Sequence, residues 1–399
     1  MSKLTICGGG NAAHALLALA CGAGWDVDLY APHANEAGRL NAALQANNGL
    51  VARFADGRQL RGYAHRVSAH PADVIPGSAL ILLALPAFAH GSTLNQVTPY
   101  LDSDATIGVL PARSGFDYQL RALYPYRRVP YTFFGLQSLP WACRITAYGQ
   151  EVEILGTKAG VDIAAWPAQK TPDLARQLQP LFGVNLRPVS SFLALTLANT
   201  GQLIHPGIMY GLCAGHENAT YSVDDAPLFY QGVDEHTAAR LQAMSDDVQT
   251  LAATLEERIP HFDAAEVLAL HCWLLQAYPH DVQDGGTLRA AFNSNRAYCG
   301  LRLPLRPLQN NAYAVDFTAR YLSEDVPFGL VVLRGIAQLA GAETPAIDEV
   351  INWAQVRLGQ RYLVDGALCG PDVPRARAPQ SYGITSIAEL RDWNVVTHA

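Results

Sequence analysis

Several features that would assign this 399-residue chain to other protein classes are missing. Its seven cysteines are odd in number and form no Cys-x-x-Cys pair, which argues against a disulfide framework or a zinc site and favours reduced thiols. The net charge is −7, and no dense Lys/Arg stripe is present to neutralise a phosphate backbone. We therefore expect neither a metal nor a nucleic-acid partner.

Membrane and export signals are missing as well. The richest apolar stretch, Ala79–Ala89, is interrupted by Pro86 and is too short to span a bilayer. The residues after Met1 lack the basic segment, apolar segment and cleavage site of a secretory leader. With no heptad seam either, we expect a cytoplasmic monomer whose partners are small molecules. Half of the residues are hydrophobic and 16% are charged, which is typical of a well-buried globular enzyme with room for two domains.

The first part of the chain alternates short apolar strands with helical segments. The expected strands are Lys3–Cys7, Asp26–Tyr30, Ala79–Leu85 and Thr106–Leu110, and the expected helices include Ala12–Cys21 and Glu36–Ala46. Near-continuous apolar strands joined by short glycine-containing links are typical of a buried parallel sheet. The sequence predicts an α/β fold, with a doubly wound Rossmann domain over residues 1–189.

The pattern changes near residue 190. Apolar residues there recur at i, i+3 and i+4, as on the buried face of a helix. The segments with this spacing are Ser191–Thr200, Asp234–Glu257, Ala264–Ala277, Phe328–Leu339 and Thr344–Gly359. We predict a mostly helical second domain over residues 190–399, in which the Pro/Arg-rich segment Pro371–Pro379 is an irregular surface stretch.

A glycine motif joins the first strand to the first helix. Gly8, Gly9, Gly10, Asn11, Ala12 and Ala13 read as G-x-G-x-x-A. Gly8 would permit the tight turn, Gly10 would let a pyrophosphate approach, and Ala13 would let the helix pack on the strand. These residues predict a dinucleotide site, although glycines that only make a tight turn would give the same string.

The acid that usually binds the adenosine ribose is missing from its expected place. Tyr30 is followed by Ala31-Pro32-His33, Asp28 lies inside the strand, and Glu36 comes several residues late. The nearest arginine is Arg39, so no pocket for a 2′-phosphate is evident and NAD(H) is favoured. Leu85 and Pro86 end an apolar strand, where they would either lie beneath the cofactor or form ordinary core and loop.

Candidate chemical groups follow the expected domain boundary. His205, in the string Asn199–Gly207, lies at the end of a helical stretch just after the expected domain boundary, and Arg320 precedes Asp325 by five positions. An imidazole, a carboxylate to orient it and a guanidinium for a substrate carboxylate are a set suited to hydride transfer on a keto acid. From spacing alone, a structural histidine and a solvated helix end remain the simpler interpretations.

Long strings along the chain resemble the opine dehydrogenase family. They are Cys7–Asn11 (CGGGN), Pro86–His90 (PAFAH), Leu139–Ile145 (LPWACRI), Leu155–Lys158 (LGTK), Ala226–Asp234 (APLFYQGVD), Arg320–Pro327 (RYLSEDVP) and Tyr362–Leu368 (YLVDGAL). The strings stand in the family's order and cover essentially the whole chain. The resemblance implies a Rossmann domain, a helical opine domain, and reductive joining of pyruvate to an amino acid with NADH, a reaction that reoxidises NADH in anaerobic glycolysis.

The resemblance also implies residue roles. His205 and Asp325 would form the catalytic pair, and Arg320 would hold the pyruvate carboxylate. Substrate-binding roles fall to Asn199, Cys143 and Trp273; the last two match positions lining the amino-acid side of the site in arginine-using members, although plain buried packing would also explain them.

Arg113 departs from the neutral residue that the family pattern leads us to expect. A guanidinium facing the substrate would favour a small zwitterion (alanine, glycine, β-alanine or taurine) over arginine. Alternatively, Arg113 points to solvent and arginine is the substrate. A dehydrogenase of the glycerol-phosphate or ketopantoate type, and a catalytically silent NAD-binding sensor, are the competing functions.

Overall fold

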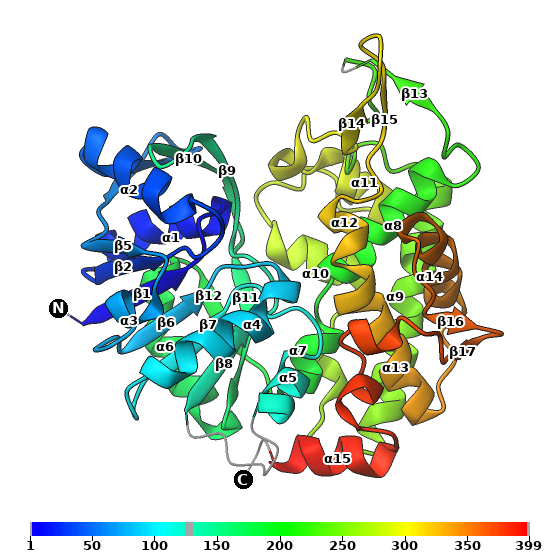
Figure 1. Ribbon diagram of the computed structural model, residues 1–399. Helices are drawn as coiled ribbons and strands as arrows, with labels where there is room; N and C mark the ends of the chain where they lie inside the picture. Colours follow the sequence, from blue (N-terminus) through cyan, green and yellow to red (C-terminus); the bar gives the residue numbers. More distant parts are fainter. Residues whose placement is uncertain (1, 124–130, 223, 397–399) are drawn as a thin grey trace. The chain divides into compact units, whose positions relative to one another are not determined.

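The computed structural model describes residues 2–123, 131–222 and 224–396 (Figure 1). The chain forms two compact units: unit 1 contains Met1–Ala112 and Leu120–Leu195, and unit 2 contains Arg113–Gln119 and Thr196–Val396. The main segment of unit 2 thus begins at Thr196, slightly after the boundary that we expected at residue 189. The sequence did not indicate that Arg113–Gln119 leaves unit 1. Among the described residues, no helix combines the length and apolar character needed to cross a membrane.

Unit 1 is built on an eight-stranded sheet. Its strand order is β12-β11-β8-β7-β6-β1-β2-β5, and every neighbouring pair is parallel except β8 and β11. The strands are β1 Lys3–Cys7, β2 Asp26–Tyr30, β5 Arg66–Ser68, β6 Leu80–Leu83, β7 Thr106–Val109, β8 Thr132–Leu136, β11 Gly160–Trp166 and β12 Asn185–Pro188. The doubly wound parallel sheet predicted from the sequence is confirmed.

A second, smaller sheet covers the first helix of unit 1. It has the order β4-β3-β10-β9, formed by Gln59–Gly62, Leu50–Phe54, Glu151–Thr157 and Trp141–Ala147. Helix α1 (Asn11–Gly22) contacts β1 and β2 of the large sheet and all four strands of the small one. The other helices are α2 Glu36–Ala46, α3 Pro71–Val74, α4 Ala87–Val97, η1 Thr98–Tyr100, η2 Ala168–Lys170 and α6 Thr171–Phe182, with α5 Phe116–Leu123 crossing the unit boundary.

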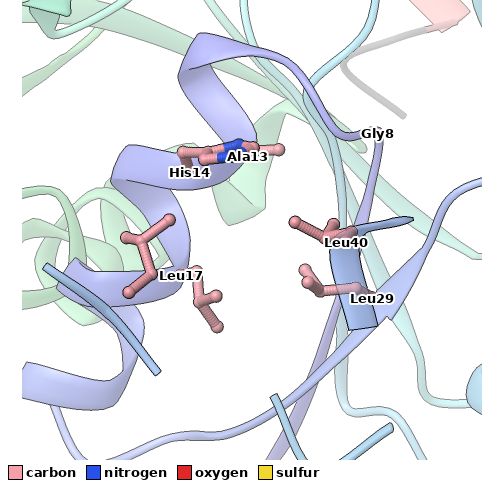
Figure 2. Close-up of a pocket in the computed structure, with 7 residues that line it drawn as sticks. Gly8, Ala13, His14, Leu17, Leu29 and Leu40 are labelled. Carbon is pink, nitrogen blue, oxygen red and sulfur yellow. The ribbon is translucent and has the colours of Figure 1, made fainter. Parts of the chain in front are cut away.

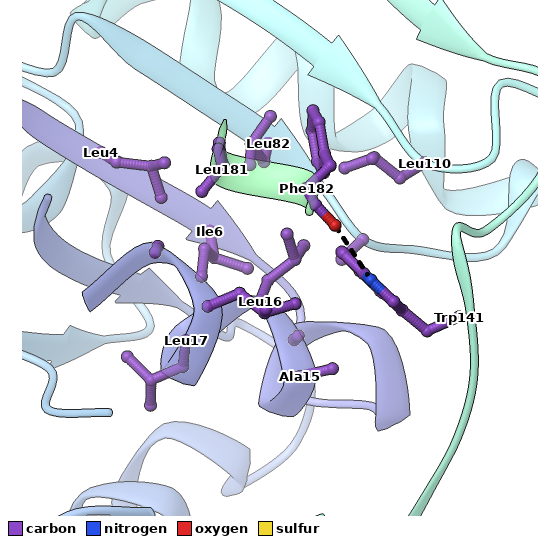
Figure 3. Packing of buried hydrophobic residues seen from close by; sticks show 14 of the residues in the cluster. Leu4, Ile6, Ala15, Leu16, Leu17, Leu82, Leu110, Trp141, Leu181 and Phe182 are labelled. Atoms are coloured by element: carbon purple, nitrogen blue, oxygen red, sulfur yellow. Dashed lines mark hydrogen bonds between the residues drawn. The ribbon is translucent and has the colours of Figure 1, made fainter. Parts of the chain in front are cut away.

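The core of unit 1 explains why α1 is apolar on all sides (Figure 3). Every residue from Ala13 to Ala20 is buried, because the helix is enclosed by two sheets. Leu16 and Leu17 belong to the same cluster as Leu4 and Ile6 of β1. This packing fixes the start of α1, and with it the glycine turn, on a rigid base.

Unit 2 is mainly helical. Helices α8, α9, α13 and α14 pack against one another. Helix α7 (Phe192–Leu197) crosses the unit boundary. The other helices are α8 Gly201–Cys213, α9 Glu235–Glu256, η3 Ala264–Glu266, α10 Leu270–Ala277, α11 Leu288–Ser294, η4 Arg296–Tyr298, α12 Arg320–Ser323, η5 Val326–Leu330, α13 Val331–Ala340, α14 Pro345–Leu358, η6 Val373–Arg375, η7 Pro379–Tyr382 and α15 Ile387–Val396. The strands are β13 Thr220–Tyr221, β14 Leu305–Pro307, β15 Tyr313–Val315, β16 Leu363–Val364 and β17 Ala367–Leu368.

Two predicted helices of unit 2 are interrupted. The segment expected over Ala264–Ala277 divides into η3 and α10 because Ala269 has an extended ψ of 144°. The segment expected from Phe328 starts as the π-helical turn η5, in which Phe328 leaves helical geometry, and continues as α13. A π-helical turn inside a helix commonly marks a functional site.

The prediction of an irregular surface stretch at Pro371–Pro379 is wrong in its second half. Arg377 is fully buried, and its neighbours Ala376 and Ala378 are buried too. The Arg377 N–H donates to the carbonyl of Pro327 at 3.0 Å, and its guanidinium lies 5.1 Å from the centre of the Phe328 ring. Composition suggested exposure, but partners far away in the sequence enclose this arginine.

Candidate active site

The glycine turn in unit 1 has the geometry of a dinucleotide site. Gly8 adopts φ +125°, and a Cβ atom there would lie 2.7 Å from the carbonyl oxygen of Ala84, so only glycine fits. A Cβ atom at Gly10 would meet no heavy atom within 4 Å, which leaves this side open to a ligand. Gly10 gives α1 no side-chain cap, so the first N–H groups of a twelve-residue helix can bind an anion. These residues fit a pyrophosphate.

The other predicted cofactor residues gather beside this turn. The Leu85 side chain lies 3.1 Å from the Cβ position of Gly8, and Pro86 directly precedes α4. Ala13 is buried in the core, and Ala12 is partly buried. The side chain of Asn11 has a different partner, because its Oδ1 accepts the N–H of Ile145 in β9 at 2.9 Å.

An acidic side chain lies where the sequence seemed to lack one. Glu36 is the first residue of α2, and a Cβ atom at Gly9 would lie 2.6 Å from its Oε1. The Glu36 carboxylate thus lies over the glycine turn although it comes later in the sequence than the usual ribose-binding acid. The sequence gave no signal for this, because the path of the loop after β2 decides where the side chain points.

His14 ties the glycine turn to the small sheet. Its Nδ1–H donates to the carbonyl of Gly10 at 3.0 Å, and its Nε2 accepts the N–H of Gly149 at 2.9 Å. This pattern requires the neutral ring. Burial lowers the pKa of His14 to about 4, outweighing the opposite effect of the Gly10 bond.

A small apolar hollow lies directly behind the turn. Figure 2 shows His14 and Ala13 on one side of it and Leu29 and Leu40 on the other. The side chains around it are apolar apart from His14. Because it offers so few polar partners, we interpret it as a packing gap of the core and not as the nucleotide site.

In unit 2, His205 and Asp325 form the contact that we predicted. His205 lies on α8, and Asp325 precedes the π-helical turn. The Nδ1–H of His205 donates to Oδ2 of Asp325 at 2.8 Å, and Asp325 is fully buried. Since the carboxylate fixes the proton on Nδ1, the neutral ring offers the Nε2 lone pair for chemistry.

The aromatic residues around His205 were missed from the sequence. The Tyr230 hydroxyl lies 3.0 Å from Nε2 of His205, and burial raises the pKa of Tyr230 well above its ordinary value, so it remains a hydroxyl donor. Tyr321 stacks on the imidazole with ring centres 4.4 Å apart. Both residues belong to strings that carried the family resemblance, so their presence was visible but their role was not.

Two arginines and two carboxylates extend the His205–Asp325 pair into a network. The Arg320 Nε donates to Oε2 of Glu324 at 2.5 Å, while its side chain is 56% exposed. Glu324 is buried and pairs through Oε1 with Arg113 Nε at 3.3 Å. Arg113 Nη1 pairs in turn with Oδ1 of Asp325. Glu324 belongs to the string Arg320–Pro327, but the sequence gave it no role.

The structure departs from both expectations for Arg113. Its side chain is only 11% exposed and is paired with two carboxylates, so it is neither pointing to solvent nor free to bind a substrate acid. Burial opposes its charged form, but the carboxylates of Asp325 and Glu324 outweigh this effect and raise the pKa of the guanidinium.

Two predicted substrate residues hold buried polar atoms that lack protein partners. Among the described residues, Asn199 Nδ2 and Trp273 Nε1 have no hydrogen bond, although both side chains are buried. A Cβ atom at Gly201 would lie 3.4 Å from Asn199 Oδ1, 3.7 Å from Arg113 Nη1 and 3.8 Å from His205 Cε1. The unsatisfied donor of Asn199 therefore lies near His205, where a polar ligand would satisfy it.

Trp273 reaches His205 through aromatic contacts within unit 2. Its ring meets Tyr278 edge-on, Tyr278 meets Tyr298, and Tyr298 stacks on Tyr230. Cys143 belongs to unit 1, where burial raises the pKa of its thiol to about 12. A neutral thiol is not a nucleophile, so Cys143 can contribute only packing or weak hydrogen bonds.

Comparison with known proteins agrees with this arrangement. Residues 188–358 match the family model described as NAD/NADP octopine/nopaline dehydrogenase, alpha-helical domain. The chain is 35% identical to octopine dehydrogenase of Pecten maximus over 96% of its length and 97% of the relative's. It is 33% identical to tauropine dehydrogenase of Arabella iricolor, covering 98% and 100% of the two chains.

Solved structures lead to the same group. A structure of octopine dehydrogenase with NADH and L-arginine has a TM-score of 0.86 and 34% identity, covering 98% of each chain. A ketopantoate reductase from Ralstonia eutropha, at 15% identity and a TM-score of 0.56, shares the fold alone. The chain belongs to the octopine dehydrogenase family, NAD-dependent oxidoreductases that act on CH–NH donors.

Proposed function

We propose that this protein is an opine dehydrogenase that joins pyruvate to an amino acid through the amine nitrogen. The observation that carries the proposal is the imidazole of His205, held between Asp325 and Tyr230. The buried donors of Asn199 and Trp273 support a polar substrate in the same unit.

The reaction has three steps on the substrates. The neutral amine attacks the keto carbon of pyruvate to give a carbinolamine, which loses water to form an imine. Bound at the glycine turn, NADH would supply the hydride that reduces the imine carbon, and the product is a secondary amine between two acid groups. The net reaction consumes pyruvate, the amino acid, NADH and one proton, and it yields the opine, NAD⁺ and water.

His205 moves the protons. Its Nε2 lone pair takes a proton from the ammonium group of the amino acid, and the imidazolium then protonates the departing hydroxyl of the carbinolamine. Asp325 keeps the proton on Nδ1 and stabilises the imidazolium. The exposed guanidinium nitrogens of Arg320 can bind the pyruvate carboxylate, while its Nε stays on Glu324.

NAD(H) is the cofactor, and the glycine turn with the start of α1 would hold its pyrophosphate. Glu36 would accept hydrogen bonds from the ribose hydroxyls. An anionic carboxylate at this place would repel a 2′-phosphate, which supports NADH over NADPH.

For the amino substrate, the preference for small zwitterions over arginine loses its physical reason. It required a free guanidinium at Arg113, but two carboxylates neutralise this group. Repulsion of an arginine substrate by Arg113 is therefore no argument, and the amino acid has to be identified by assay.

The test is NADH oxidation with pyruvate and, in turn, arginine, alanine, glycine, β-alanine and taurine. We expect oxidation to require both pyruvate and one of the amino acids, and mass spectrometry to show the secondary amine. NADH oxidation that proceeds with a keto acid alone and yields a 2-hydroxy acid would overturn the proposal in favour of a ketopantoate-type reductase.

A further inference from the structure

We propose that Arg113 is a positioning residue that acts on His205 through Asp325: it holds the carboxylate in place and offsets its charge. The inference deepens the proposed function, because it concerns the proton-transferring histidine of that reaction. It replaces the substrate-binding role that the sequence suggested for Arg113.

The two oxygens of Asp325 are divided between two partners. Oδ2 accepts from His205 Nδ1, whereas Oδ1 pairs with Arg113 Nη1. A carboxylate held by only one of its oxygens can rotate, and rotation would release the imidazole. With the guanidinium on the other oxygen, Asp325 keeps a single orientation toward His205.

The backbone around Arg113 is itself held within unit 2. Arg113 adopts φ +55°, a conformation that is uncommon for residues with a side chain. The next two residues are tied down, since Ser114 N–H donates to the Phe328 carbonyl at 3.1 Å and Gly115 N–H donates to Thr196 Oγ1 at 3.0 Å. This anchoring explains why the segment belongs to unit 2 and aims the guanidinium at Asp325 and Glu324.

The charges show what Arg113 contributes. Asp325 and Glu324 are buried carboxylates, and Arg113 pairs with both of them. Arg320 pairs with Glu324 and is more than half exposed. Without Arg113, the negative charge of Asp325 would be compensated mainly by His205. This would favour the imidazolium form of His205. Among the described residues, the titratable or charged groups in direct contact with this histidine are Asp325, Tyr230 and Tyr321. One step further out are Arg113, Glu324, Arg320, Tyr278, Tyr298 and Arg377.

A permanently protonated His205 could not begin the reaction. It must be neutral to accept the proton from the amino acid's ammonium group, and it can return that proton only afterwards. Arg113 therefore favours the neutral form of His205, with which the proton transfer begins.

The test measures protonation of His205 directly and needs no substrate. The titration midpoint of its imidazole is followed by NMR of histidine-labelled protein, with the resonance assigned through His205→Gln. In Arg113→Gln we expect the midpoint to rise by about one to two pH units, the scale for removing a unit charge near a buried site. Arg113→Lys keeps the charge but loses the planar fork, so its midpoint should rise by less than half as much.

A matched control is available in the same unit. Arg334 pairs with Asp348 at 2.9 Å, and its side chain is 12% exposed, almost as buried as that of Arg113. Arg334→Gln removes a comparable buried cation away from His205 and should leave the midpoint unchanged. If Arg113→Gln fails to fold, Arg113→Met takes its place, because it also removes the charge and keeps a long side chain. An unmoved midpoint in the folded variant that lacks the charge would overturn the proposal.

The kinetic readout separates this proposal from the proposed function. With the amino acid that supports turnover in the panel above, Arg113→Gln should lose roughly 10-fold in activity one pH unit below its raised midpoint, and it should recover most of this activity above the midpoint. If the midpoint shifts but NADH oxidation does not depend on an amine, the positioning role of Arg113 is supported and the proposed opine dehydrogenase activity is refuted. Normal amine-dependent oxidation with a pH profile like that of wild type would do the reverse.

Discussion

Replacing His14 should remove a pH-dependent part of the stability of unit 1. The folded protein holds this histidine neutral, with a pKa lowered by burial from 6.5 to about 4. A base whose pKa is depressed by folding contributes stability that is fully present above its unfolded pKa and is lost as the pH falls through the interval below it. The window therefore runs from about pH 6.5 down to about pH 4.

The magnitude follows from the shift. A shift of about 2.5 pKa units, at 1.36 kcal/mol each, limits the stability lost by protonation of His14 to about 3 kcal/mol. This loss is approached as the pH falls to the folded pKa. The main physical cause is burial of the ring, which disfavours the charged form. In addition, the N–H of Gly149 points at Nε2 and leaves no acceptor for a second proton there. Protonated His14 would leave two donors opposed in a buried site.

Hydrogen exchange of α1 peptides between about pH 7.5 and pH 4.5 measures this effect locally, with rates corrected for intrinsic pH dependence. His14→Gln should cost about 1–3 kcal/mol near pH 7.5 through its lost hydrogen bonds, and the difference from wild type should shrink toward pH 4.5. His70→Gln, which changes an exposed histidine of unit 1, is the control. A wild-type-to-variant difference that stays constant across the whole range would refute the reasoning. Burial raises the pKa values of Asp117 and Asp247 to about 6. Because both residues are present in wild type and variant, their pH-dependent contributions to stability cancel in the difference.

Three further predictions concern the two sites. His205→Gln should reduce turnover by roughly 10²-fold in steady-state kinetics, the usual scale for loss of a general acid–base group; near-normal turnover in both directions would contradict the assignment. Gly10→Val should abolish NADH binding measured by fluorescence titration, because its side chain would fill the open face of the turn; retained affinity would show that the cofactor approaches elsewhere. Glu36→Gln should weaken NADH binding roughly 10-fold or more, and it should reduce the preference for NADH over NADPH. An unchanged ratio of the two dissociation constants would exclude Glu36 as the ribose ligand.

Local patterns made much of unit 1 predictable. The strands Lys3–Cys7 and Asp26–Tyr30 were located from their apolar character alone, and the glycine string lies at the turn where it was expected. These signals are short-range, since strand periodicity and turn chemistry depend on neighbouring residues. The small sheet had no comparable signal, because β3 pairs with β10 nearly a hundred positions later.

Features that depend on long-range charge were harder to predict. The pairing of Arg113 with Asp325 joins positions 212 apart, and Arg377 becomes buried through residues near Pro327 and Phe328. An arginine read from the sequence is assigned to the surface, since its burial needs counter-charges that composition does not reveal. The His205–Asp325 contact was predicted only because the family resemblance supplied the pairing.

Two histidines show why hydrogen-bond partners, and not the tautomer, distinguish a structural ring from a reactive one. His14 and His205 both carry their proton on Nδ1 and both have a partner at Nε2. At His14 those partners are a backbone carbonyl and a backbone N–H, which cannot exchange roles, so a second proton is excluded. At His205 they are a carboxylate, which stabilises the imidazolium, and the Tyr230 hydroxyl, which can donate to the lone pair or accept from an N–H. Only the second arrangement tolerates both protonation states, and a histidine that transfers protons needs both.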